Sequence, residues 1–202
     1  PAHRAYLSDF YEGGFPGSFA ALAGLEKART PDEVEAAVQR ILLGHALIAG
    51  FGGIPLIYMG DELAMGNDHG YLDVPEHAHD SRWLHRPRMD WALATATEGV
   101  SARVLQGVKT ILARRRATEG LHAAHPQRVL PCPRDPVLAM QRLAPTGAIL
   151  GLYNFSEHWQ QVPGRWLRDH GLLEGYDALS DANVTLHDDQ LALPPFGRVW
   201  LR

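Results

Sequence analysis

The chain of 202 residues contains little cysteine, since Cys132 is its only one. A single thiol excludes an internal disulfide framework and a cysteine-ligated zinc site, and it suits a reducing compartment. Long apolar runs are missing as well, because no stretch approaches the length that spans a bilayer and the start carries no hydrophobic signal region. We therefore expect a cytoplasmic protein with no membrane partner. Pro1 is followed at once by patterned sequence, so we also expect a piece of a longer chain, which leaves secretion open.

Positive charge is not concentrated on the chain. The net charge is -4, and apart from short clusters such as Arg114–Arg116 the basic residues are scattered. Without a broad basic face for a phosphate backbone, nucleic acid is not an expected partner. The sequence has no CxxC pair, no phosphate-binding glycine loop and no GxSxG elbow. Its hydrophobic content of 46% is nevertheless ample for a packed core.

The first half shows the pattern of a parallel α/β protein. Thr30, Pro31 and Glu33 form a helix start with a capping box, and apolar residues then recur every three or four positions. Glycines end this helix. The run "IPLIYMGDE" at 54–62 is short, apolar and ended by acids, which predicts a strand buried on both faces. A helix, a glycine turn and a buried strand are typical of a parallel sheet.

A long irregular loop follows, and then a second helix. From Gly66 to Trp91 the periodicity disappears, and loops of this length within a compact domain are usually functional or disordered. An apolar stripe resumes over 100–112, with basic residues in the last turns and an end near Gly120.

The remaining sequence has the texture of a separate module. "PVLAMQRL", "AILGLYNF", "VTLHDDQLALP" and "GRVWLR" are short alternating segments separated by turn residues, which predicts antiparallel strands. We therefore expect two domains, residues 1–121 and residues 122–202.

Two groups of ionisable residues lie directly before the irregular loop or within it. Asp61 and Glu62 lie where the predicted strand ends, but neighbours on a strand point to opposite faces, so they are poorly placed as a converging acid/base pair. They either act in catalysis or anchor the loop. His77, His79 and His85 are possible metal ligands, but no patterned partner accompanies them, and we expect a solvated loop without a metal.

The stretch "HDSRWLHRPRMDW" is rich in arginine and tryptophan. Arg82, Arg86 and Arg88 offer planar donor forks, which bind carboxylates, phosphates or arrays of sugar hydroxyls. The alternative is that they pair with Asp80 and Asp90 and hold the loop in place. We expect this structural role for two of the three.

These motifs resemble one family. "GGIPLIYMGDE", then Asn67 and Asp68, then "DSRWLHRPRMDW" resemble the eighth barrel strand and following loop of the α-amylase superfamily, and the "DSRW" with "HRP" form is similar to the amylosucrase family. "HRAYLSDFYEGGFPGSFA" is similar to the segment after the seventh strand. "ILGLYNFSE" and "LALPPFGRVWL" resemble that family's C-terminal β domain, so the resemblance covers nearly the whole chain.

The resemblance implies a fold and an activity. The fold class is α/β: the C-terminal part of a (β/α)8 TIM barrel, from the end of the seventh repeat to the last helix, followed by a small antiparallel β-sandwich domain. The activity implied is that of a bacterial retaining glucosyltransferase, which transfers glucose from sucrose to an α-1,4-glucan or to water and releases fructose. Sucrose and the glucan or oligosaccharide acceptor would be its partners, with no cofactor and no metal.

The resemblance also assigns residues. Arg82 matches an arginine that closes the floor of the sucrose pocket by pairing with an aspartate from an early barrel loop. Arg4 and Tyr6 match positions beside the acceptor subsites, and Asn67 and Asp68 belong to the same substrate-binding motif. The residues expected to structure the loop are Asp61, Glu62, Asp80 and Arg86.

Two departures accompany the resemblance. The nucleophile, the acid/base and the third aspartate, together with the N-terminal part of the barrel, are expected before residue 1, so no catalytic residue is assigned and the chain alone should be inactive. The acceptor-binding loop expected after Ala20 is missing, which keeps a sucrose hydrolase or a trehalose-forming mutase as alternatives. Another alternative is a non-catalytic carbohydrate-binding fragment in which Trp159, Trp166 and Trp200 stack on sugar, against the possibility that they pack in the core.

Overall fold

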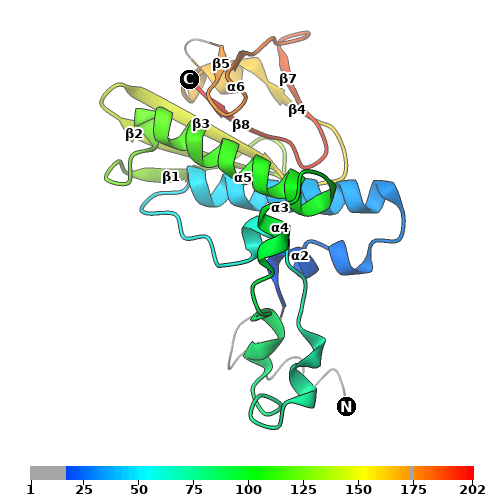
Figure 1. Ribbon diagram of the computed structural model, residues 1–202. Helices are drawn as coiled ribbons and strands as arrows, with labels where there is room; N and C mark the ends of the chain where they lie inside the picture. Colours follow the sequence, from blue (N-terminus) through cyan, green and yellow to red (C-terminus); the bar gives the residue numbers. More distant parts are fainter. Residues whose placement is uncertain (1–16, 173–174) are drawn as a thin grey trace. The chain divides into compact units, whose positions relative to one another are not determined.

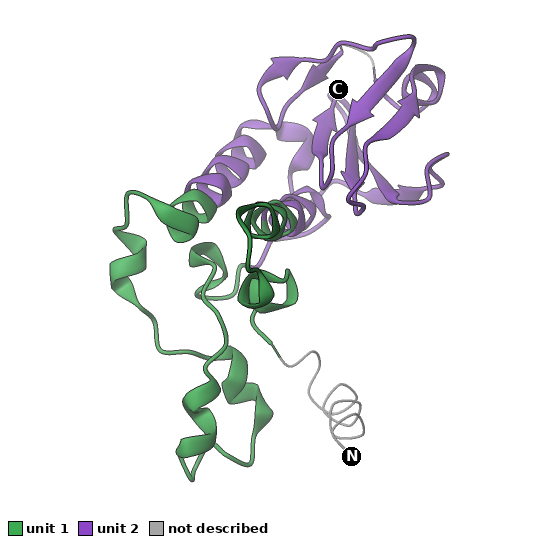
Figure 2. Ribbon diagram, turned by 90° about the vertical axis from the view of Figure 1, so that its right-hand side faces the viewer, with its two compact units in different colours: residues 1–41, 57–105 green, residues 42–56, 106–202 purple. Residues whose placement is uncertain are grey.

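The computed structural model describes residues 17–172 and 175–202. These residues form two compact units (Figure 2): unit 1 comprises residues 17–41 and 57–105, and unit 2 comprises residues 42–56 and the described residues from 106 to 202. Arg4 and Tyr6, the positions matched to the acceptor subsites, lie outside the described residues. The predicted boundary between residues 121 and 122 concerns domains of the whole protein and stays a prediction.

Short elements make up most of unit 1. They are α2 (Phe19–Leu22), η1 (Leu25–Lys27), η2 (Asp61–Leu63), η3 (His69–Asp73), η4 (Ser81–His85) and α4 (Trp91–Ala94). The unit also holds the first parts of the two long helices, α3 (Pro31–Gly50) and α5 (Gly99–Ala117), which continue into unit 2. The predicted irregular loop is thus a series of single 3₁₀ turns joined by extended chain.

The start of α3 is the predicted capping box. The Glu33 backbone N–H donates to Thr30 Oγ1 at 3.2 Å, and the Thr30 N–H donates to Glu33 Oε2 at 3.0 Å. Pro31 occupies the first helical position, where its missing N–H costs no hydrogen bond. Both long helices predicted from apolar spacing are confirmed, and in α5 the stripe buries Val104 and Val108.

The predicted strand at 54–62 is wrong for this structure. No strand forms there, and Ile54 and Leu56 are 89% and 80% exposed. A parallel strand exists only through hydrogen bonds to neighbouring strands, and the described residues supply none beside this segment. The segment instead ends in a turn at Gly60, with a φ of 93°, and enters η2.

The C-terminal module of unit 2 is antiparallel, as predicted (Figure 1). One sheet has the strand order β1-β2-β3-β8-β5-β6, and a second sheet pairs β4 with β7. The bounds are β1 Gln127–Leu130, β2 Val137–Ala144, β3 Gly147–Asn154, β4 Gln160–Pro163, β5 Tyr176–Asp177, β6 Ala182–Asn183, β7 Gln190–Leu193 and β8 Arg198–Leu201, with η5 (Glu119–Leu121) before β1 and α6 (Gly164–Asp169) after β4.

The core of this module lies along its central strands. Leu150 and Leu152 of β3 and Leu201 of β8 are fully buried, and the partly buried Trp166 packs against the same cluster. Trp200 is fully buried too, and its Nε1 donates to the Tyr153 hydroxyl at 3.0 Å. No helix among the described residues is both long and apolar enough to cross a membrane.

Two arginines of unit 2 hold the C-terminal end of α3. Arg142 is 1% exposed, and its guanidinium donates four hydrogen bonds of 2.6 to 3.3 Å to the backbone carbonyls of Gly50, Phe51, His122 and His125. Arg115, from α5, donates to the carbonyls of Ala49 and Gly53. The last carbonyls of a helix have no intrahelical donor, so these guanidinium groups cap α3 and the glycine turn after it.

Candidate functional site

A hollow in unit 1 brings together residues from three separate segments. Its volume is about 300 Å³, and its polar lining comes from Ser18, Tyr58, Asp61 and His85. Ser18 precedes α2 and caps it, Tyr58 and Asp61 belong to the segment after the glycine turn, and His85 ends η4. The lining therefore joins the end of the expected eighth barrel strand to the arginine-rich loop.

Asp61 is the most perturbed carboxylic acid in this hollow. Burial is the main cause that raises its pKa to about 6; the hydrogen bond from the Phe19 backbone N–H opposes the shift, and the charge of the neighbouring Glu62 adds to it. Glu62 points elsewhere, since its Oε2 accepts a hydrogen bond of 2.8 Å from the Gly60 N–H. The two acids thus do not converge, and Asp61 is a group that exchanges a proton near neutral pH.

His85 completes the polar part of the hollow. Burial lowers the pKa of its imidazole, and the neighbouring Arg86 lowers it further, so the neutral ring is favoured. Its ring lies edge-on to Tyr58 with centroids 6.5 Å apart. Its Nδ1 is buried and has no hydrogen-bond partner among the described residues. A neutral imidazole with an unused nitrogen can donate one hydrogen bond to a small polar ligand or accept one from it.

Asn67, predicted to bind substrate, ties two segments of unit 1 together. Its Oδ1 accepts from the Ser18 N–H at 2.6 Å, and its Nδ2 donates to Glu26 Oε2 at 3.1 Å. The Asn67 backbone N–H donates to the other oxygen of Glu26 at 2.6 Å. Both ends of the amide are therefore engaged within the protein.

Asp68, the other member of that motif, shapes the start of η3. Its Oδ1 accepts from the Gly70 N–H at 3.0 Å, and its own N–H donates to Leu84 O at 2.7 Å. The second bond joins η3 to η4 across the loop. Asp68 thus helps to fix where η4 and its arginine lie.

Arg82 and Asp80 form an ion pair at the start of η4. Arg82 Nη2 lies 2.7 Å from Asp80 Oδ2, and Arg82 Nε lies 2.8 and 3.0 Å from the two carboxylate oxygens. Asp80 Oδ1 also accepts from the Arg82 backbone N–H at 3.0 Å, which caps η4. Hydrogen bonds from Arg82 and its charge lower the pKa of Asp80 to about 2, with a smaller contribution from Arg86.

The histidines of the loop do not form a metal centre within the described part of the chain, where no cluster of three or more potential ligands occurs. His77 instead stacks on Trp83, with ring centroids 3.7 Å apart and planes 13° apart. This stack packs the preceding turn against η4.

Tyr58 and Ser18 were not among the residues selected from the sequence. Tyr58 looked like one residue of a buried apolar run, and its exposure of 45% reveals it as a lining residue. Ser18 carries a local signal, because a serine directly before a short helix is a preferred N-cap.

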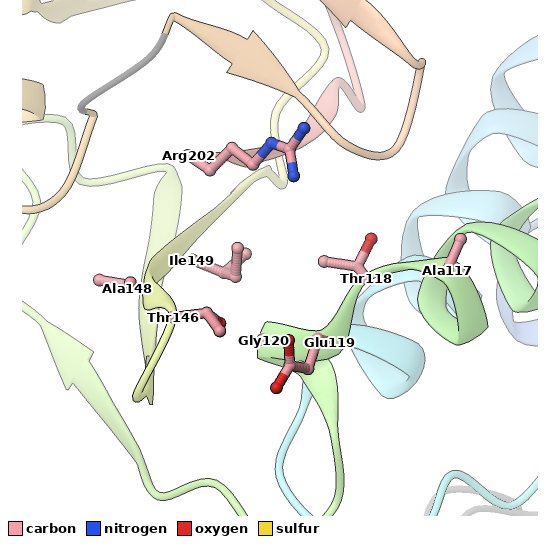
Figure 3. Close-up of a pocket in the computed structure, with 9 residues that line it drawn as sticks. Ala117, Thr118, Glu119, Gly120, Thr146, Ala148, Ile149 and Arg202 are labelled. Atoms are coloured by element: carbon pink, nitrogen blue, oxygen red, sulfur yellow. The ribbon is translucent and has the colours of Figure 1, made fainter.

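A second hollow lies in unit 2, between the end of α5 and the β2–β3 turn (Figure 3). Thr118, Glu119, Thr146 and Arg202 contribute its polar side chains, and Ile149 contributes apolar surface. Arg202 also lies over the Tyr176 ring, 4.5 Å from its centroid. None of the residues selected from the sequence lines this hollow.

Comparison with known protein families finds a match for the C-terminal module. Residues 127–202 match the model of the amylosucrase C-terminal domain. The module is an amylosucrase-type C-terminal domain. The match covers the part of the chain that begins with β1 and ends after β8.

Solved structures extend the likeness to the rest of the chain. The cyclic α-maltosyl-(1→6)-maltose hydrolase from Arthrobacter globiformis, in complex with that sugar, aligns over 84% of this chain with a TM-score of 0.57 and 20% identity. An Anoxybacillus α-amylase aligns over 91% with 0.57 and 18%. An AmyP variant in complex with maltotriose aligns over 85% with 0.64 and 15%.

The chain spans about a third of the length of these structures, namely 31%, 35% and 36%. The chain thus has the fold of the C-terminal part of an α-amylase-family protein of glycoside hydrolase family 13: the end of a (β/α)8 barrel followed by a small antiparallel β domain. In a complete (β/α)8 barrel the eighth strand is paired on both sides, so the segment at 54–58 would be covered there if it forms the eighth strand that the sequence predicts.

Proposed function

We propose that the whole protein is a retaining glucosyltransferase that takes glucose from sucrose, releases fructose and passes glucose to an α-1,4-glucan or oligosaccharide. The observation that carries the proposal is the coincidence of two features: the loop "DSRWLHRPRMDW" and an amylosucrase-type C-terminal domain on the same chain. A cytoplasmic, bacterial location forms part of the proposal.

In this proposal Arg82 forms part of the floor of the sucrose pocket. Its side chain is 57% exposed, and the bonds to Asp80 use only Nε and Nη2. The Nη1 end of the fork donates to no other described residue, so it remains for a second carboxylate from elsewhere in the barrel. Asp80 would then orient the guanidinium, and the pocket would be closed to longer chains by a charge-assisted pair.

The chemistry requires two carboxylates about 5 Å apart, one to attack the anomeric carbon and one to protonate the departing fructose. Asp61 and Glu62 do not form that pair, because Glu62 is bonded to the turn at Gly60. We therefore assign Asp61 and Glu62 to the shape of the loop, as we do Asp80 and Arg86. Asp68, first predicted to bind substrate, joins them because its hydrogen bonds lie within the loop. The nucleophile and the acid/base belong, in this proposal, to other strands of the barrel, and residues 1–202 alone would release no fructose.

The test is an assay of the full-length protein with sucrose, following both fructose and glucan. We expect fructose release and a growing α-glucan, and Arg82→Ala should lower kcat/KM for sucrose about 100-fold or more. Arg88→Ala is the matched control, since Arg88 is an exposed arginine of the same loop that forms no hydrogen bond or ion pair with the described residues. A folded full-length protein that releases no fructose from sucrose would refute the proposal.

One observation favours a second candidate in the same superfamily. α2 ends at Leu22 and η1 begins at Leu25, so no inserted acceptor-binding loop lies between them. A sucrose hydrolase or a mutase that forms trehalose needs no such loop. Product analysis distinguishes the candidates. Glucose and fructose in equal amounts from sucrose indicate hydrolysis, trehalose formed from maltose indicates the mutase, and insoluble glucan with fructose indicates the transferase.

A further inference from the structure

We propose that the C-terminal β domain carries a carbohydrate-binding surface on the turn between β3 and β4, with Trp159 and Phe155 as its apolar contacts and an α-1,4-glucan chain as its ligand. The proposal rests on the proposed function, because the glucan is the acceptor and product of that reaction. It concerns a surface of unit 2 and none of the residues of the sucrose site.

The three tryptophans of the domain have different surroundings. Trp200 is fully buried and bonded to Tyr153, and Trp166 stacks on His170 with centroids 4.4 Å apart. Trp159 is 63% exposed, and Phe155, four residues earlier in the same turn, is 52% exposed. Covering a large exposed aromatic surface with the apolar face of a ligand is favourable, because it removes that surface from water. Of the three, only Trp159 therefore offers a ring for stacking.

The turn that bears these rings is held in one conformation by Asn154. The Asn154 side chain is fully buried, and its Nδ2 donates to the carbonyls of His158 and Pro194, each at 2.8 Å. Its Oδ1 accepts from the Ser156 N–H at 3.0 Å and from the Ser156 hydroxyl at 2.7 Å. All four hydrogen bonds of this one amide are thus made within or next to the five-residue turn, and they fix its conformation.

The flanks of the turn are tied down as well. The Phe155 N–H donates to Pro136 O at 2.9 Å, and the Phe196 N–H donates to Ser156 O at 3.2 Å. Hydrogen bonds fix this turn at its start and in its middle and join it to the segment before β8. Such a turn loses little conformational freedom when a ligand binds. Exposed aromatic rings on such a rigid support are suited to recognition.

Exposed polar residues next to the rings in the sequence indicate the class of ligand. Glu157 and His158 lie between Phe155 and Trp159 in the sequence and are exposed, and Gln161 follows on β4. A glucopyranose ring has an apolar face of C–H groups and a rim of hydroxyls, so it needs both a flat ring and nearby donors and acceptors. A protein partner favours a contiguous apolar core, which the intervening polar residues interrupt. We therefore favour a glucan chain.

The test is affinity electrophoresis of the full-length protein in gels containing glycogen, with titration by maltoheptaose as a second measurement. Trp159→Ala should weaken glycogen binding about tenfold, Phe155→Ala should weaken it less, and Trp159→Tyr should retain most of it. Val129→Ala is the matched control, since Val129 is 61% exposed on β1 of the same domain, and it should bind as the unaltered protein does.

Three outcomes decide the matter. Unchanged glycogen binding by Trp159→Ala overturns the proposal. A loss of binding that comes with a lower thermal midpoint also overturns it, because Trp159 would then pack against another part of the protein. If the full protein releases no fructose from sucrose but binds glycogen through Trp159, the proposed function fails and the glucan surface stands.

Discussion

Arg82 and Asp80 are two residues apart in sequence, and this short spacing lets one carboxylate cap η4 and hold the guanidinium of the same turn. The pairing lowers the pKa of Asp80 to about 2, below the ordinary value of 3.8. Because the folded-state pKa is depressed, the associated stability is present above about pH 4 and is lost as the pH falls toward 2. Both side chains are partly exposed, so the effect is local.

Arg82→Ala should therefore raise the pKa of Asp80 toward its ordinary value, because the largest cause of the shift is removed. A carboxyl NMR titration of residues 1–202 measures this directly. Arg82→Lys keeps the charge but not the fork and should give an intermediate pKa. An Asp80 pKa that stays near 2 in Arg82→Ala would show that another group holds the carboxylate.

For Asp61 we expect the opposite dependence of stability on pH. Its folded-state pKa is raised to about 6, mainly by burial, so folding favours the protonated acid. The free energy of unfolding should fall as the pH rises from about 4 to about 6 and then level off. Asp61→Asn should raise the thermal midpoint at about pH 7.5 and leave it nearly unchanged at about pH 4. Glu98→Gln, at an exposed carboxyl group of the same unit, is the control. An equal effect of Asp61→Asn at both pH values would contradict the role of ionisation.

At the scale of elements, the end of α3 depends on the absence of one side chain. A Cβ on Gly50 would overlap with the Tyr153 hydroxyl, well inside van der Waals distance, and would lie 2.9 Å from Trp200 Nε1. Gly50→Ala should lower the free energy of unfolding by about 1–3 kcal/mol, as overpacking of a core does. Urea unfolding measures this value. The double variant Gly50→Ala/Tyr153→Phe should recover part of it, since the hydroxyl is gone, and strictly additive effects would argue against the contact.

The same end of α3 depends on Arg142. Arg142→Met would keep much of the buried volume but leave the carbonyls of Gly50 and Phe51, among others, without a donor. We expect the free energy of unfolding to fall by about 3 kcal/mol or more, because buried unpaired polar groups carry their full cost of desolvation. Arg116→Met is the control, since Arg116 is an exposed arginine near the end of α5 with no hydrogen bond to the described residues, and it should change stability little. Equal urea midpoints for the two variants would contradict the capping role.

At the scale of the whole molecule, the segment after the glycine turn is apolar and exposed. Ile54 and Leu56 are almost fully accessible in residues 1–202, whereas the fold to which the chain belongs pairs such a segment on both sides. Exposed apolar chain of this kind promotes self-association.

Leu56→Lys should therefore have opposite effects in two contexts. In the isolated chain we expect it to reduce self-association, measured by light scattering. In the full-length protein the same substitution would bury an unpaired charge in the barrel, and the yield of folded protein should fall sharply. Full-length Leu56→Lys that folds normally would show that the segment is not a barrel strand.

Local patterns were enough to predict much of the structure. Thr30 and Glu33 determine where α3 starts because a capping box is closed within four residues, and apolar spacing determines the buried faces of α3 and α5. The antiparallel strands follow from alternation and turn residues, since hairpin partners are close in sequence. The resemblance to the amylosucrase family rested on short motifs, and the match of residues 127–202 supports it for the C-terminal domain.

The tertiary structure decided what depends on distant partners. Whether 54–62 forms a strand depends on neighbouring strands, because a ladder needs two sides, and the described residues provide none. Spacing alone could not separate the buried Trp200 from the exposed Trp159, since burial is set by the elements packed around each ring. In the same way the hollow that joins Ser18, Asp61 and His85 exists only because three segments far apart in the sequence meet in unit 1.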